Sequence, residues 1–130
     1  MGRTNITVAV GALFMLVAVL LGAFGAHALK ARLVPEMLAV YQTGVQYHLI
    51  HALGLMVIGA IQNTGANNHH GSQLLKLAAI LIAAGIVLFS GSLYVLAITG
   101  VTMFGAITPL GGLCFLAGWV LVALQMLRRG

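Results

Sequence analysis

Residues 77–127 read LAAILIAAGIVLFSGSLYVLAITGVTMFGAITPLGGLCFLAGWVLVALQML and contain no charged side chain. A helix needs about 20 apolar residues to cross a hydrocarbon layer roughly 30 Å thick, so a run of 51 residues is long enough for two crossings. The segment 99–102 is the only polar break in it. The run therefore predicts transmembrane helices over about 74–98 and 105–127, joined by a tight turn.

Two further crossings are predicted in the N-terminal half. Residues 6–26 contain no ionisable group, so the first span is expected at about 6–27. The second span is expected at about 42–62, within a helix that begins earlier, at Pro35, because proline is favoured in the first helical turn. Between the two spans we expect a short amphipathic segment that lies in the membrane interface.

The composition of the whole chain agrees with four crossings. Of the 130 residues, 62% are hydrophobic and 5% are charged, whereas about 25% are charged in an ordinary soluble domain, which excludes a water-soluble fold. We predict one all-α domain over residues 1–130, a four-helix transmembrane bundle surrounded by membrane lipid. The net charge of +5 reflects the scarcity of acidic residues and not a basic patch, so no nucleic-acid partner is expected.

The basic residues predict the orientation of the bundle. Four spans place both termini on the same face, where four basic residues are expected: Arg3, Lys76, Arg128 and Arg129. The opposite face carries only Lys30 and Arg32. Because Lys and Arg are enriched on the cytoplasmic side of membranes, we expect both termini in the cytoplasm (N-in, C-in).

The second predicted span carries more polar side chains than any other span. Polar groups are costly in contact with lipid, so they are expected to face the bundle interior, a subunit interface or a wet cavity. At 100° per residue they fall on two arcs of the helix, Thr43, Tyr47, His48 and His51 on one, Gln42 and Gln46 on the other. Partners on the third and fourth helices complete the predicted polar cavity or interface: Ser90, Ser92, Tyr94 and Thr108.

Two interpretations of these polar residues stay open. They can hydrogen-bond one another and fix the packing of the bundle, as interhelical polar contacts do in many membrane proteins. Alternatively, they can line a cavity that binds a small solute, a lipid headgroup or protons.

Small residues predict where helices approach closely. Ala18, Gly22 and Ala26 recur at every fourth position, so they share one face of the first helix. Such a stripe lets another helix approach. Gly91 is expected to have the same role in the third helix.

The sequence predicts neither a metal or cofactor site nor catalysis. His48 and His51 share a helix face, but a closed zinc site needs four ligands, often with cysteine among them, and bis-histidine haem needs histidines on facing helices. Glu36 is the only carboxylate side chain, and no serine lies in a nucleophile motif. A membrane enzyme acting on lipid or quinone is the least favoured alternative.

Four strings together touch every predicted span: GAFGAHALK (22–30), YQTGVQYHLIHALGL (41–55), FSGSLYVLAITG (89–100) and GAITPLGGLCFLAGW (105–119). In these strings the chain resembles the YgdD/YwdK family of small bacterial inner-membrane proteins (domain of unknown function 423). That family has animal mitochondrial relatives of the transmembrane-protein-256 type. The resemblance implies a multi-pass, four-helix protein of the bacterial inner membrane and assigns no reaction.

Two functions are compatible with these features. The first is a binding, accessory or assembly protein that forms a homo-oligomer or packs against another membrane protein. The second is a small oligomeric transporter or channel whose polar path is lined by the second and third helices. In that case His27, Lys30 and Glu36 are expected at its outer mouth.

Overall fold

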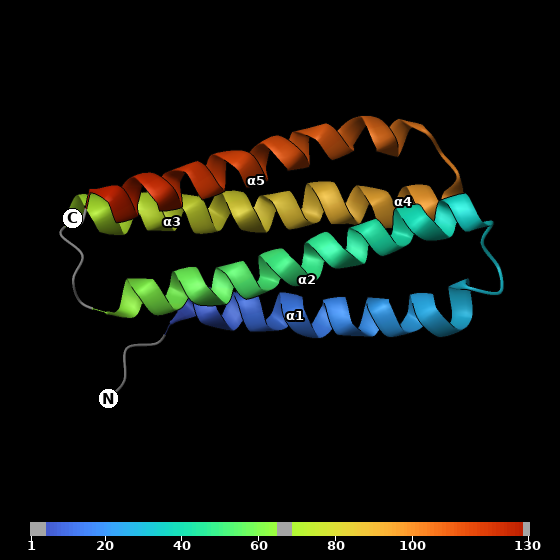
Figure 1. Cartoon of the computed structure of the whole chain (residues 1–130), viewed down its shortest axis with the longest axis horizontal. Coiled ribbons are helices and arrows are strands. Elements are labelled where there is room, and N and C mark those ends of the chain that lie inside the picture. The colour runs from blue at the N-terminus through green and yellow to red at the C-terminus, as the bar shows by residue number, and fades with distance from the viewer. Residues whose placement is uncertain (1–4, 65–68, 129–130) are drawn as a thin grey trace.

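The computed structural model describes residues 5–64 and 69–128, and in these ranges all regular structure is helical. In chain order the elements are α1 (Ile6–Phe24), η1 (Gly25–Leu29), α2 (Pro35–Asn63), α3 (His69–Gly85), η2 (Ile86–Ser90), α4 (Gly91–Thr99) and α5 (Met103–Leu127). The π-helical turns η1 and η2 continue the helices before them, so the elements form four rods (Figure 1). Each rod is long and apolar enough to cross a membrane. The predicted all-α fold of four transmembrane helices is confirmed.

Local signals set the ends of the rods. Asn5 caps α1, because its side-chain oxygen accepts a hydrogen bond from the Val8 amide at 3.1 Å. Pro35 and Glu36 occupy the first turn of α2, where the missing proline N–H is harmless and the carboxylate faces the positive end of the helix dipole. Gly100 ends α4 with φ of 70°, a left-handed conformation that only glycine adopts without strain. This residue forms the predicted tight turn.

The rods pack as two neighbouring pairs (Figure 1). The most extensive contacts join α1 to α2 and α3 to α5, and α2 also packs against α3, η2 and α4. In the apolar stretch of α2, 44% of the residues are buried inside the bundle. In the apolar stretch of the first span, only 11% are buried. The first rod is therefore the least covered by the rest of the chain.

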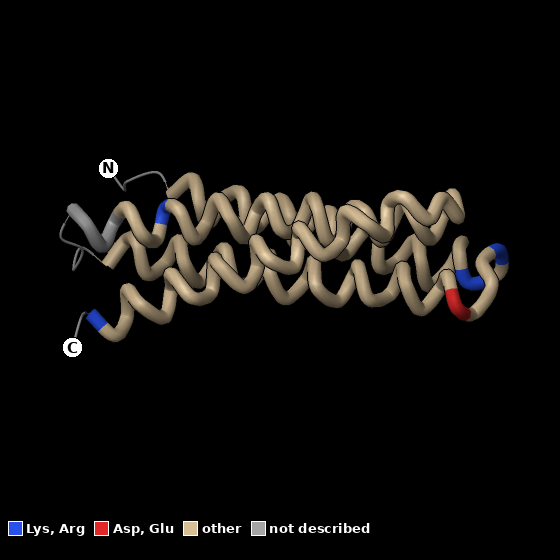
Figure 2. The backbone as a smooth tube through the Cα atoms, turned by 90° about the horizontal axis from the view of Figure 1, so that it is seen from above, with Lys and Arg blue, Asp and Glu red and all other residues tan. Residues whose placement is uncertain are grey.

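Charged side chains lie only at the two ends of the described rods (Figure 2). Lys76, in the N-terminal part of the rod formed by α3, η2 and α4, and Arg128, after α5, lie toward the end that also carries both chain termini. Lys30, Arg32 and Glu36 lie at the opposite end. The apolar length between these ends is the part of the bundle that fits the hydrocarbon layer.

The seam between α1 and α2 depends on small residues spaced seven apart. A Cβ atom on Gly25 would lie 2.5 Å from Tyr41 Cε1, and one on Gly11 would lie 2.8 Å from Met56 Cγ. Between these two glycines, Ala18 is fully buried. A spacing of seven keeps side chains on one face of a helix, so this line lets α2 pack directly against α1.

The predicted small-residue stripe coincides only in part with this seam. Ala18 belongs to it, and a Cβ on Gly22 would lie 3.2 Å from Val45 Cγ1, but Ala26 is exposed. Gly91 does not lie at a close helix contact within the chain, because a Cβ there would meet no described atom within 4 Å, and its predicted packing role stays a prediction. Gly91 directly follows η2, and a π-turn shifts the positions after it around the helix axis relative to a regular α-helix.

Candidate functional site

The predicted polar residues do not form one cluster. Some lie inside the bundle: His48, His51, Ser90 and Ser92 are buried, and Tyr94 and Thr108 are half-buried. Others lie on the outer surface of α2: Gln42, Thr43, Gln46 and Tyr47. The helix therefore has a polar side that faces its own chain and a polar side that faces the surroundings.

Tyrosine rings and a histidine link α1, α2 and α4 in the interior. His48 Nδ1 lies 3.0 Å from the Tyr94 hydroxyl, and the Tyr41 hydroxyl donates to the Leu21 carbonyl at 2.7 Å. The two tyrosine rings lie 5.0 Å apart between centroids. Tyr94 reaches this position because Gly44 leaves room for it; a Cβ there would lie 2.9 Å from Tyr94 Cε1. The hydroxyl groups are thus satisfied inside the chain, as buried tyrosine requires.

A second polar contact joins α4 to α5. Ser92 Oγ donates to the Phe89 carbonyl at 2.9 Å and lies 2.7 Å from Thr108 Oγ1. The Thr108 hydroxyl also lies 3.4 Å from the Phe104 carbonyl, to which it can donate, so either hydroxyl can be the donor in the contact between Ser92 and Thr108. Two buried polar atoms, Ser90 Oγ and His48 Nε2, have no hydrogen-bond partner among the described residues.

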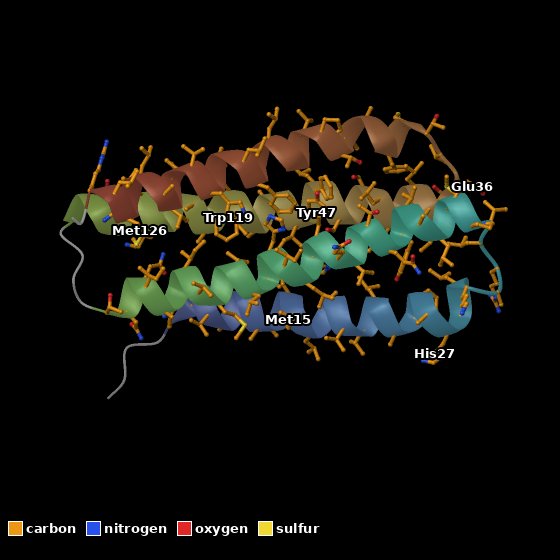
Figure 3. All side chains as sticks on the ribbon, viewed as in Figure 1. Met15, His27, Glu36, Tyr47, Trp119 and Met126 are labelled. Atoms are coloured by element: carbon orange, nitrogen blue, oxygen red, sulfur yellow. The ribbon has the colours of Figure 1, made fainter. Side chains whose placement is uncertain are left out.

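An aromatic hollow of about 500 Å³ opens between α2 and α5 near the middle of the bundle. Figure 3 shows two of its residues, Tyr47 and Trp119, at mid-length. We call it the aromatic hollow; its lining consists of Tyr47, His51, Phe89, Pro109, Gly112, Leu113, Phe115, Leu116 and Trp119. The His51 ring stacks on Phe115, with centroids 3.5 Å apart and an angle of 12° between the planes.

Bare glycines on facing helices position the aromatic walls. The Phe115 ring lies against Gly85 of α3, and the Phe89 backbone lies against α5 where that helix has a glycine. Trp119 reaches across to α2 because Gly54 has no side chain; a Cβ there would lie 2.8 Å from Trp119 Cη2. The hollow therefore forms where large aromatic residues pack against glycines on α2, α3 and α5.

A second surface hollow, of about 240 Å³, lies between α1 and α2. We call it the glutamine groove; it is lined by Gly22, Gly25, Ala26, Tyr41, Gln42, Val45, Gln46 and Leu49. Gln42 and Gln46 are exposed and make no hydrogen bond to a described residue. Thr43 next to them differs, because its hydroxyl donates to the Ala39 carbonyl of the same helix at 3.0 Å.

The residues predicted at an outer mouth do not converge. His27 lies in η1 and points away from the bundle, far from Glu36 at the start of α2 (Figure 3). Lys30 is exposed in the turn between them. No three His, Cys, Asp or Glu side chains of the described ranges lie together in a way that could hold a metal ion.

The comparisons with known proteins agree with this membrane architecture. A family model described as "Protein of unknown function (DUF423)" matches residues 21–112. The chain belongs to this family. The matched residues include those of α2 that line the two hollows and those of α4 that make the polar contacts.

Relatives of the same kind match nearly the whole chain. The UPF0382 membrane protein YwdK of Bacillus subtilis is 44% identical over 124 residues, which is 95% of this chain and 98% of the relative. A UPF0382 membrane protein of Staphylococcus haemolyticus is 42% identical, over 91% of this chain and 92% of the relative. A third, from Staphylococcus epidermidis, is 41% identical, over 95% and 97%. No solved structure matches.

These matches make the chain a multi-pass bacterial membrane protein, since the relatives are named membrane proteins and four apolar helices are long enough to cross. The names indicate no enzymatic function.

Proposed function

We propose that this DUF423 protein is an assembly protein of the membrane that self-associates through the glutamine groove. The observation that carries the proposal is the position of Gln42 and Gln46. Both side chains are exposed on the outer surface of α2, and neither bonds to a described residue. A second copy of the chain is the occupant that would satisfy them.

Both amides lie within the hydrocarbon layer when the bundle spans a membrane. The middle of α2, which extends over Pro35–Asn63, is residue 49. At 1.5 Å per residue, Gln46 is about 4.5 Å and Gln42 about 10 Å from mid-depth, inside a layer whose half-thickness is about 15 Å. An amide that meets only hydrocarbon is penalised by a few kcal/mol, so a partner surface is strongly favoured.

A second copy supplies the matching surface. Each carboxamide carries two N–H donors and an acceptor oxygen, so two such groups can bond reciprocally across a two-fold axis, where one surface faces itself. Gly22 and Ala26 line the same groove and leave room for an approaching helix. The first rod, which forms one wall, is also the least buried of the four described rods.

The test is a native mass spectrum of protein extracted gently from its own membrane. The wild-type chain is expected at twice its mass of 13.5 kDa. The double variant Gln42→Leu/Gln46→Leu is expected to dissociate roughly tenfold more readily, since interhelical polar contacts contribute about 0.6 kcal/mol each. Thr43→Val is the matched control, because that hydroxyl already bonds within its own helix.

Three results separate the alternatives. A dimer that the glutamine variant weakens and the threonine variant leaves intact supports the proposal. A wild-type monomer contradicts it. A complex with a different membrane protein, lost in the glutamine variant, identifies the groove as an interface and makes the chain an accessory subunit instead.

The orientation is part of the same proposal. We infer that the end of the bundle with both termini faces the cytoplasm, on the excess of basic residues there. In intact cells an impermeant thiol reagent is expected to label Ala31→Cys in the turn before α2 but not Thr64→Cys at the other end, in a Cys114→Ala background. The reverse labelling would invert the bundle.

Transport is the second candidate, supported by the same two unpaired amides. If two copies leave the glutamine groove wet, Gln42 and Gln46 would line a polar path at the interface. Proteoliposomes should then show solute or proton flux that is lost in Gln46→Leu. Flux no greater than in empty liposomes would exclude this candidate and leave self-association unaffected.

A further inference from the structure

We propose that the aromatic hollow between α2 and α5 binds a lipid-soluble ring compound with a phenolic hydroxyl group, of the quinol class. The hollow lies on a different face from the glutamine groove, so the proposal is independent of self-association. It is carried by a histidine that is almost wholly buried and directs one free ring nitrogen to an aromatic-walled space.

His51 has a defined tautomer. Its Nδ1 lies 2.7 Å from the Tyr47 carbonyl oxygen, and a carbonyl can only accept, so Nδ1 carries the proton. In the neutral ring Nε2 is then an acceptor. No described residue bonds to Nε2. Unlike His48 Nε2, which is buried without a partner, His51 Nε2 is not fully enclosed by protein atoms. The side chain is only 6% exposed, and it lines the hollow, so we infer that this acceptor faces the hollow.

The walls fit a flat ring. Tyr47 and Phe115 lie nearly parallel to the His51 ring, at 13° and 12° to it, and Trp119 also lines the hollow. The His51 and Phe115 rings already stack on each other, so a planar ligand would stack, with an offset, on the aromatic faces that this cluster leaves open to the hollow. The volume of about 500 Å³ lies within the usual range of about 300–1,000 Å³ for small-molecule sites.

The position of the hollow selects for a ligand that arrives through lipid. His51 is two residues from the middle of α2, so the hollow lies near mid-depth of the bilayer. Leu113 and Leu116 at its edge are 62% and 66% exposed, which leaves an apolar entrance. A lipid acyl chain could enter by the same route, but it carries no donor for the Nε2 acceptor, whereas a quinol hydroxyl does.

The chain contains one tryptophan, and it lies in the wall of the hollow, so its fluorescence reports occupancy directly. The test is a titration of the purified protein in lipid nanodiscs with a decyl hydroquinone. The matched ligand is the same compound with both hydroxyl groups methylated, which keeps the flat ring and the tail but removes the donors. We expect saturable quenching by the hydroquinone, with an affinity roughly tenfold above that of the dimethyl ether.

Two variants attribute this difference to the site. In His51→Leu the affinity for the hydroquinone should fall roughly tenfold, to that of the ether, while the ether itself is unaffected. Gly112→Leu should abolish saturable quenching by both ligands while His51 is kept. A Cβ at this position has room, with Phe89 Cδ2 3.8 Å away, so the variant fills the hollow without a backbone clash and stays informative if His51→Leu does not fold.

Gln42→Leu on the opposite side of α2 is the control and should bind as the wild type does, whatever happens to the dimer. Equal affinity of the two ligands for the wild type would overturn the proposal. Quenching that rises without saturation and is identical in Gly112→Leu would overturn it as well, because it would reflect partition of the ligand into lipid.

Discussion

The two polar sides of α2 differ in whether their side chains have hydrogen-bond partners within the chain. On the inner side, Tyr94 supplies a partner for His48, and the Tyr47 carbonyl supplies one for His51. On the outer side, Gln42 and Gln46 have exposed amides with no described partner. On the inner side, the Nδ1 atom of each histidine therefore has a partner within the chain. The outer set is explained only by something beyond it, which is why we place the interface there.

The largest expected effect comes from breaking the inner side. Gly44→Leu would force a side chain into Tyr94, since even a Cβ at this position would lie 2.9 Å from its ring, and overpacking of this kind costs about 3 kcal/mol. Thermal unfolding in detergent should show a clear loss of stability. Gly91→Leu is the matched control, because no described atom lies within 4 Å of a Cβ there. Equal losses in both variants would refute the glycine–ring packing.

A smaller loss is expected from removing one hydrogen bond on the same side. Tyr94→Phe keeps the ring but leaves His48 Nδ1 without its partner, at a cost of about 1–2 kcal/mol. Thr43→Val on the exposed side should change the free energy of unfolding by less than about 0.5 kcal/mol. A Tyr94→Phe protein as stable as the wild type would show that the inner hydrogen bond is dispensable.

The smallest effect on stability is expected on the outer side, where the change should appear in association instead. Ala26→Leu fills the glutamine groove from an exposed position and should weaken the dimer roughly fivefold while the fold stays intact. Ala9→Leu, also exposed on α1 but on another side, should leave association unchanged. Energy transfer between labelled copies in vesicles measures both, and equal values in the two variants would argue against the groove.

The four spans could be predicted because their signals are local. An uncharged run of sufficient length, a proline at a helix start and a glycine in a turn each act within a few residues. Pro35 and Gly100 lie where the sequence predicts a helix start and a turn. The same reasoning also locates the polar residues on α2, since helical periodicity follows from numbering alone.

The pairing between helices could not be predicted, because it depends on the register of one rod against another. Phe115 and Trp119 look like ordinary apolar residues in an apolar run; only the glycines opposite them, Gly85 and Gly54, make them walls of a hollow. Tyr41 likewise joins the interior contacts because Gly25 faces it. Large rings opposite glycines on another helix are the signal that a search for such sites could use.

The sequence also could not predict which polar residues of α2 are buried and which are exposed. Thr43, Tyr47, His48 and His51 share an arc of α2, yet the arc is wider than the side that other helices cover. Its two histidines are buried, and its threonine and tyrosine are exposed. Periodicity gives the angle between residues, but it does not say where a neighbouring helix ends.

Self-association through the glutamine groove is tested most directly by cross-linking in native membranes. In a Cys114→Ala background, Ala26→Cys lies in the groove, and Val120→Cys lies on α5 and is 56% exposed. With a short bifunctional thiol reagent we predict a dimer band for the first and none for the second, and loss of that band when Gln42 and Gln46 are replaced by leucine. A band of equal strength from Val120→Cys, or none from Ala26→Cys, would contradict the account.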